Sequence, residues 1–331
     1  MSETSAKAPW YKNPMTLGVL AGVAYGLIVQ AAARTGHRKE VIGVMSLGFV
    51  FVLPFALGFL TTHWGGYKQN RSFSYFLFAP SLTAMASMIC AIAIGWEGLI
   101  CLVLATPVYL FMGAVGGFFA WVFHRVLAAR EAETRLPVLM SALVIVAPPL
   151  TAFYESGQTL PLALHKVHTE IAVHASRDKV WEKIIRVEPI VEETTGFFYH
   201  IGFPKPIEAS LSQEGVGGVR HARFEKDLVF IETVDEWVDK ERLSFAIDVD
   251  PSATPLTTLD PHVTVGGTYF DVMRGTYWIE ARGQNEQVLH LESEFRLSTA
   301  FNRYAGFWGD FLMRDIQTSI LRVIKARCEA P

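Results

Sequence analysis

The residue best placed to carry chemistry is Asp315, which borders an apolar helical stripe near the end of the chain. It follows Leu312 by three positions and directly precedes Ile316. A carboxylate there could point into a cavity, where burial would raise its pKa and suit it to acid–base work. The commoner arrangement is a structural pair with an arginine from a neighbouring element. The sequence leaves both interpretations open.

His262 is the second candidate for proton transfer, since it follows Asp260-Pro261 between two strand-like runs. The alternative interpretation is that His262 is an ordinary loop histidine. His200 and His221 complete the histidines of interest, but nothing in the spacing of the three forces them to converge as metal ligands would. Gly215-Val216-Gly217-Gly218 precedes a strand, which makes it a turn and not a phosphate site. We therefore expect neither a metal nor a cofactor.

Four aromatic residues are the candidates for contact with a ligand: Tyr269, Tyr277, Tyr304 and Trp308. Such side chains line apolar pockets and use their polar tips to orient one end of a ligand. Core packing explains most of them equally well, and Tyr304 and Trp308 are the pair expected nearest a cavity. Glu232 and Asp235 alternate with apolar residues, so at least one of them is expected to face solvent.

These residues need elements to position them, and the clearest is a terminal helix over Phe301–Cys328. Its apolar residues recur every three or four positions and form one wide stripe, with Gln317 off the stripe's centre. Such a stripe requires a concave apolar partner.

The segment before the helix can supply that partner. His168–His174 alternates as a strand does, Ser176 can cap a helix over Arg177–Val187, and a short helix or lid is expected within Glu188–Pro206. Strand-like runs separated by turn residues follow, at Ile207–Leu211, Gly218–Phe224, Leu228–Trp237, Leu243–Val249, Val263–Val272, Thr276–Ala281 and Gln287–Leu297. The plan is α+β: a curved antiparallel sheet around a long C-terminal helix.

The first half of the chain has a different composition. Hydrophobic residues make up 51% of the 331 residues, mean hydropathy is +0.28, and most of the excess precedes residue 155. Five segments approach the ~20 residues that a spanning helix needs, at roughly Met15–Ala33, Val41–Thr62, Phe73–Trp96, Leu99–Phe123 and Leu136–Phe153. We predict a multi-span transmembrane domain over 1–155, a linker over 156–166 and a globular domain over 167–331.

Charge follows the same division. Residues 1–160 hold ten Lys/Arg and six Asp/Glu, whereas residues 161–331 hold nineteen and twenty-six. The acidic second half argues against a nucleic-acid partner. Seven basic residues lie on one side of the predicted spans and four on the other. This favours a protein of the bacterial inner membrane with a cytoplasmic amino terminus and a periplasmic C-terminal domain. Gly18, Gly22 and Gly26 form a small-residue face for packing within the chain or, alternatively, against a second copy or another membrane protein.

Residues 167–328 resemble the START-like helix-grip superfamily, often labelled the polyketide cyclase/dehydrase and lipid transport family. The resemblance lies in the order of IAVHASRDKVWEKI, GVGGVRHARF, VDEWVDKERLSFAI and the terminal helix, and covers about half the chain. It implies an apolar pocket between sheet and helix. Members of the family bind lipids, sterols, quinones, polyketides or plant hormones, and only some are enzymes.

The function expected is therefore membrane-anchored binding or transfer of an apolar ligand, such as a lipid, a quinone or an aromatic polyketide-like molecule. The partners of such a protein are membrane lipids and that ligand, and catalysis is not required. Two alternatives stay open. One is a cyclase-like or hydrolase-like enzyme that uses pocket acid and base groups, and the other is a non-catalytic accessory subunit of a membrane complex.

Overall fold

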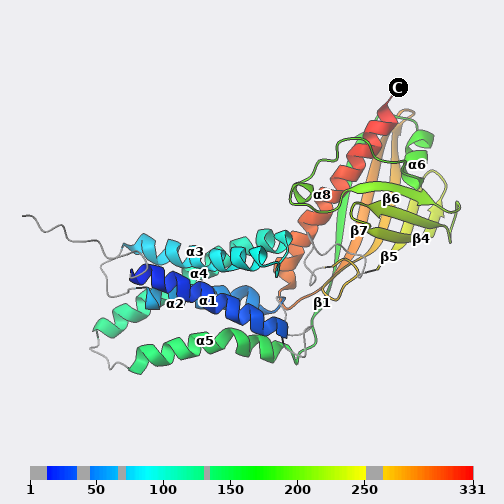
Figure 1. Ribbon diagram of the computed structural model, residues 1–331. Helices are drawn as coiled ribbons and strands as arrows, with labels where there is room; N and C mark the ends of the chain where they lie inside the picture. Colours follow the sequence, from blue (N-terminus) through cyan, green and yellow to red (C-terminus); the bar gives the residue numbers. More distant parts are fainter. Residues whose placement is uncertain (1–12, 36–44, 66–71, 130–134, 251–263, 331) are drawn as a thin grey trace, which may run out of the picture. The chain divides into compact units, whose positions relative to one another are not determined.

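The computed structural model describes residues 13–35, 45–65, 72–129, 135–250 and 264–330 (Figure 1). The chain divides into two compact units. The first holds the apolar helices up to Thr159, and the second holds the sheet and the terminal helix from Leu160 onward.

The first unit is a bundle of apolar helices, four of which are long and apolar enough to cross a membrane. Its elements are α1 (Pro14–Thr35), the π-helical turn η2 (Gly48–Val52), α2 (Leu53–Trp64), α3 (Phe73–Ala93), α4 (Leu99–Ala129) and α5 (Arg135–Glu155). The four long helices are α1, α3, α4 and α5. The second predicted span corresponds, among the described residues, to the shorter apolar helix Gly48–Trp64.

The glycine face of α1 packs against its neighbours in the bundle. A Cβ atom at Gly18 would lie 2.6 Å from the Cα of Gly65, and one at Gly22 would lie 2.8 Å from Cγ2 of Thr83. One at Gly26 would meet Oγ of Ser87 at 2.1 Å. Glycine therefore lets α1 approach α2 and α3 closely. Association with a second copy or another membrane protein through such faces stays a prediction.

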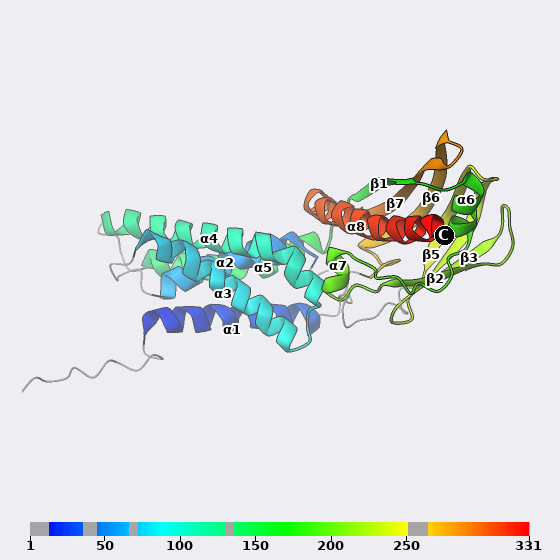
Figure 2. The same cartoon turned by 90° about the horizontal axis from the view of Figure 1, so that it is seen from above.

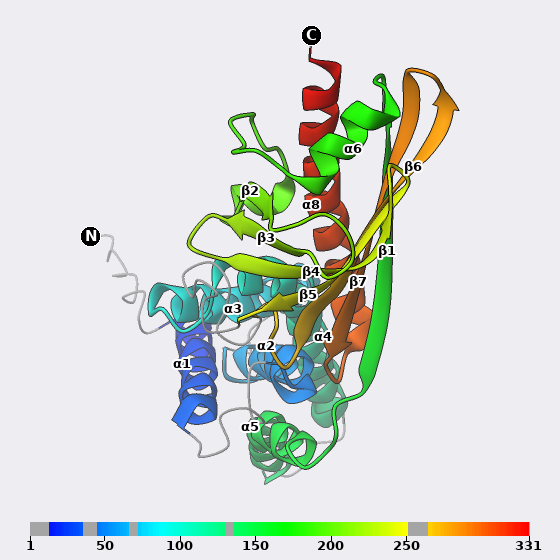
Figure 3. The same ribbon diagram turned by 90° about the vertical axis from the view of Figure 1, so that its right-hand side faces the viewer.

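The second unit is built on one antiparallel sheet of the order β1-β7-β6-β5-β4-β3-β2. Its strands are β1 (Leu162–Val173), β2 (Pro206–Leu211), β3 (Val219–Phe224), β4 (Val229–Val238), β5 (Arg242–Val249), β6 (Phe270–Gly283) and β7 (Glu286–Ser298). Three helices accompany it: α6 (Arg177–Ile185), α7 (Phe197–His200) and α8 (Asn302–Glu329). The sheet curls around α8, as Figures 2 and 3 show. This is the helix-grip architecture, and the predicted fold class is confirmed.

The core of this unit lies between the inner face of the sheet, α6 and one stripe of α8. Its buried members include Val180, Trp181, Ile184, Leu243, Phe245, Leu289, Leu291, Leu321 and Ile324. Two glycines bring α8 close to the sheet, because a Cβ atom at Gly306 would lie 2.4 Å from His165 and one at Gly309 would lie 2.8 Å from Phe295. Ser176 caps α6 as predicted, accepting a hydrogen bond from the Lys179 amide at 3.4 Å.

Three strand boundaries differ from the prediction. The run expected over Val263–Val272 forms a strand only from Phe270, and the described residues before it, 264–269, form turns and bends. The sequence suggested a turn at Arg274-Gly275, but both residues lie within strand β6, whose pairing with β7 shifts register at Val272/Arg274 and at Ala281/Gly283. Gly275 makes room for the ring of Phe245, since a Cβ atom there would meet Cε2 at 2.6 Å. Strand β1 also starts at Leu162, inside the predicted linker, because it pairs with β7 as far as Ser298.

Candidate functional site

An ion pair is buried on the inner face of the sheet. Arg220 of β3 and Glu232 of β4 are cross-strand partners, and each belongs to the strand face that is otherwise apolar. Nη1 of Arg220 donates to Oε2 of Glu232, and the two side chains are only 5% and 6% exposed. A buried pair of this kind contributes little net stability, because desolvation offsets the attraction between the charges. Its presence in an apolar interior therefore suggests a role other than stability.

Two aromatic side chains belong to the same buried region. The Arg220 guanidinium lies 5.5 Å from the ring centre of Phe245, and the Phe245 and Tyr277 rings are 6.2 Å apart. Burial raises the pKa of Tyr277 to about 12, so its hydroxyl stays protonated and able to donate a hydrogen bond at neutral pH. Burial also raises the pKa of the Glu232 carboxyl, and the Arg220 guanidinium opposes that rise.

Several polar atoms inside this unit are left without a hydrogen-bond partner in the described part of the chain. Among them are Nε of Arg220, the hydroxyl of Tyr199 on α7 and Oγ of Ser319 on α8, and the last two lie close to each other. Tyr199 is 7% exposed and Ser319 is 1% exposed, and burial raises the pKa of the Tyr199 hydroxyl. Buried polar groups normally find partners, so unpaired ones point to a water or a ligand. Together they supply donors and acceptors inside an apolar interior.

Gln317 fixes α8 against the sheet. Its Nε2 donates to the Val167 carbonyl at 3.0 Å and to Oγ of Ser293 at 2.8 Å, and its Oε1 accepts from Oγ1 of Thr169 at 2.6 Å. The side chain is almost fully buried. Sequence periodicity placed Gln317 off the centre of the apolar stripe, because hydrophobicity alone does not reveal a glutamine whose amide is fully hydrogen-bonded.

Asp315 holds α7 against α8. Its Oδ2 accepts a hydrogen bond from the Phe198 amide at 3.0 Å, in the first turn of α7. A carboxylate at a helix start satisfies a backbone donor that the helix itself leaves unpaired. The structure thus gives Asp315 a structural partner, although that partner is a backbone amide and not the arginine expected. A catalytic role for Asp315 stays a prediction.

The four predicted ligand-contact residues fall in two places. Tyr277 is buried in the core on β6, whereas Tyr304 and Trp308 lie one turn apart near the start of α8 and are partly buried. Tyr269 is also partly buried, and its carbonyl accepts a hydrogen bond from Ser298 at the end of β7. At 1.5 Å per residue, Tyr304 lies about 20 Å along α8 from Gln317. Gln317 bonds to Thr169 of β1, which pairs with the same β7 residue, Leu291, as Tyr277 does.

Within the described part of the chain, the histidines that the sequence suggested do not form a cluster. His262 lies outside the described residues, while His200 and His221 are exposed on α7 and β3. Glu232 and Asp235 were the acidic pair of which at least one was expected to face solvent. Asp235 is exposed and pairs with Arg274 at 2.6 Å, whereas Glu232 is buried. Within the described residues, a different group could hold a metal ion, namely His168, Glu170 and His290.

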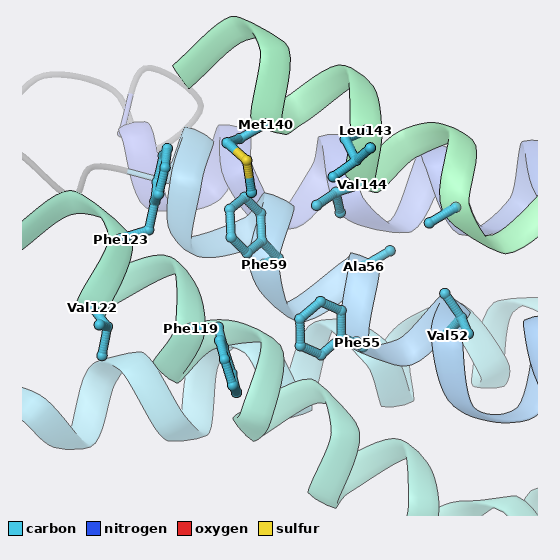
Figure 4. A pocket seen from close by; sticks show the side chains of 11 residues that line it. Val52, Phe55, Ala56, Phe59, Phe119, Val122, Phe123, Met140, Leu143 and Val144 are labelled. Carbon is cyan, nitrogen blue, oxygen red and sulfur yellow. The ribbon is translucent and has the colours of Figure 1, made fainter. Parts of the chain in front are cut away.

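The helical bundle contains a cavity of about 400 Å3 between α2, α4 and α5 (Figure 4). Its walls are entirely apolar and include Phe55, Phe59, Phe119 and Met140. Such a wall offers dispersion contacts to a hydrocarbon chain and no group for acid–base chemistry. We therefore place the candidate chemistry in the second unit.

The bundle also contains polar contacts that sequence reasoning missed. Nδ1 of His63 and Nε2 of His124 are 2.8 Å apart in its interior, and Arg34 pairs with the fully buried carboxylate of Glu97 at 2.5 Å. Ionisable groups in apolar surroundings commonly pair with one another, as these do.

No family model and no curated protein sequence matches the chain. The chain is similar to several solved structures. The aromatase/cyclase Zhui from Streptomyces sp. R1128 is 14% identical, covers 50% of this chain and 94% of its own, and has a TM-score of 0.34. Truncated norcoclaurine synthase from Thalictrum flavum is 13% identical over 50% of this chain and 97% of its own, with a TM-score of 0.30. The fold assignment for the second unit rests on its own strand order and terminal helix.

Proposed function

We propose that the helix-grip unit binds an apolar small molecule with one polar end, and that the helical bundle keeps this unit at the membrane from which the molecule comes. The observation that carries the proposal is Nε of Arg220, which is buried without a hydrogen-bond partner, together with the buried Tyr199 hydroxyl and Ser319 Oγ, which lie close to each other. A ligand head group with hydrogen-bonding oxygens would satisfy them. Four helices suited to a membrane support the anchoring.

The apolar surroundings would supply the affinity for the rest of the ligand. Each square ångström of apolar surface removed from water stabilises the complex by roughly 25 cal/mol, before the entropy cost of association. The Arg220–Glu232 pair would set the orientation of the ligand, since a buried donor left unpaired rejects a wrongly oriented molecule. No step of this function requires a bond to be made or broken.

The test is to extract and identify what co-purifies with the full-length protein in detergent. Wild-type protein is expected to carry one class of apolar molecule with a polar end, near one per chain. A variant with Arg220→Met and Glu232→Leu removes the charges together and is expected to retain its fold and lose that molecule. An equal yield of the same molecule from both proteins would overturn the proposed role of this region.

A second candidate function is proton-transfer catalysis, and the convergence of Arg220, Glu232 and Tyr277 favours it. Tyr277 would donate a hydrogen bond to a developing oxyanion, and Glu232 would accept a proton. The variant Tyr277→Phe separates the two functions. An enzyme would accumulate unconverted substrate in this variant, so the extracted molecule would differ in mass from that of the wild type. A binding protein would carry the same molecule in both.

A further inference from the structure

The outer face of the sheet carries a group of three side chains with the chemistry of metal ligands. His168 and Glu170 are two residues apart on β1 and therefore point to the same side of the strand. The cross-strand partner of Glu170 is His290 on β7. The alternation of exposed and buried residues along β1 places His168 and Glu170 on the face away from α8. This group is separate from the buried region described above.

The donor atoms are spaced as ligands of one ion would be. Nε2 of His168 lies 3.0 Å from Nδ1 of His290, which lies 3.3 Å from Oε2 of Glu170. All three donor atoms fall within 4.8 Å of one another. A tetrahedral zinc ion with bonds of about 2.0–2.1 Å holds its ligands about 3.3–3.4 Å apart. Small side-chain rotations of the two exposed residues would bring the three atoms onto one ion.

The His290 ring is held in place by its neighbours. It is 5% exposed, and its ring stacks on Trp278 with centroids 4.7 Å apart and planes within 6°. Its second nitrogen, Nε2, is buried without a hydrogen bond, and Oε2 of Glu280 lies 3.5 Å from it. Metal-bound histidines commonly direct their free ring nitrogen to a carboxylate, which sets the tautomer and strengthens the ligand.

We propose that His168, Glu170 and His290 form a binding site for a divalent transition-metal ion, with Zn²⁺ as the best match to two imidazoles and one carboxylate. Three protein ligands leave a fourth position for water or for an exogenous ligand. Glu280 is a positioning residue that acts through His290. The bound ion would join β1, at the edge of the sheet, to its neighbour β7. This inference does not depend on the proposed ligand function.

The test uses full-length protein in detergent, without a polyhistidine tag and after treatment with a chelator. Calorimetric titration with Zn²⁺ and elemental analysis after gel filtration are expected to show one ion per chain, with a Kd in the micromolar range or below. His168→Ala and Glu170→Gln replace exposed side chains, so folding is expected to survive. Each should weaken Zn²⁺ binding at least tenfold. Glu280→Gln should weaken it by about 10- to 100-fold, as loss of an outer-shell partner does.

The control variants are His221→Ala, which removes an exposed histidine from β3, and Glu294→Gln, which removes another carboxylate from β7. Both should bind Zn²⁺ like the wild type. Co²⁺ gives a second readout, because four-coordinate Co²⁺ absorbs visible light far more strongly than the hydrated ion. Failure of the wild type to bind Zn²⁺, or binding that is unchanged in both His168→Ala and Glu170→Gln, would overturn the proposal.

Discussion

Arg220 and Glu232 face each other across strands β3 and β4, and they form a salt bridge that is almost completely buried. Both occupy positions that the alternation of their strands would assign to apolar residues. The guanidinium also lies over the ring of Phe245, which is a buried member of the hydrophobic core. The helix-grip interior thus contains one charged group that is paired but not fully hydrogen-bonded.

Removal of one member of this pair should be far more harmful than removal of both. Arg220→Met leaves a buried carboxylate without its partner and is expected to destabilise the unit by about 3–5 kcal/mol. Arg220→Met combined with Glu232→Leu should lie close to the wild type, because no charge is left unpaired. Thermal unfolding of the full-length proteins in detergent measures the difference. Equal destabilisation of the single and double variants would show that the two charges are not coupled.

Asp315 is expected to act as a cap and not as an acid or base. Asp315→Ala removes the acceptor of the Phe198 amide, so it should cost about 1 kcal/mol and speed hydrogen exchange at residues 197–200. Asp315→Asn keeps an acceptor oxygen and is expected to preserve both protection and ligand binding. Loss of ligand binding or of turnover in Asp315→Asn, with exchange unchanged, would instead support the catalytic interpretation.

Much of the fold could be predicted because hydrophobic periodicity is local. The terminal helix was expected at Phe301–Cys328 and spans Asn302–Glu329, and most strand boundaries agree within one or two residues. The error at Arg274-Gly275 arose because glycine has two common uses. It permits turns, but here it leaves space for the ring of Phe245 on the next strand, which only the tertiary contact reveals.

The candidate site was harder to predict because it depends on register between strands. The sequence did carry a signal, since Arg220 shares its strand face with Ala222 and Phe224, and Glu232 shares its face with Val234. Opposite charges on the apolar faces of two consecutive strands predict a buried pair. The metal-ligand group had a weaker signal, because His168 and His290 are 122 residues apart and meet only through the pairing of β1 with β7.

Acid should weaken the attachment of residues 188–192 to α8. Arg327 donates to both carboxylate oxygens of Glu192, at 2.7 and 2.8 Å, and its hydrogen bonds lower the Glu192 pKa to about 2. The pKa is lower in the folded state, so the stabilisation is complete above the ordinary value of 4.5 and is lost as pH falls from there towards 2. Melting temperatures between pH 7 and pH 2 should therefore fall more steeply for wild type than for Glu192→Gln. Parallel curves would contradict the assignment.

If the apolar helices cross a membrane, the side that carries the helix-grip unit depends on how many segments cross it. If helix Gly48–Trp64 and the residues before it complete a fifth span, the two ends of the chain lie on opposite sides. Alkaline phosphatase fused after Pro331 should then be active in a Gram-negative host, and the same enzyme fused after Lys68 should be inactive. An inactive but well-expressed fusion after Pro331 would instead place the C-terminal end in the cytoplasm. Four crossings from a cytoplasmic amino terminus would give that result.

The central claim is that an apolar molecule occupies the helix-grip interior, and photocrosslinking tests it most directly. Full-length protein in lipid nanodiscs would be irradiated with a long-chain fatty acid that carries a diazirine group, and the labelled peptides identified by mass spectrometry. We predict labelling at α7, at the segment of α8 around Ser319 and at strands β3 and β4, with strong reduction in the Arg220→Met/Glu232→Leu variant. Labelling confined to helices α1–α5, and identical in the two proteins, would contradict the account.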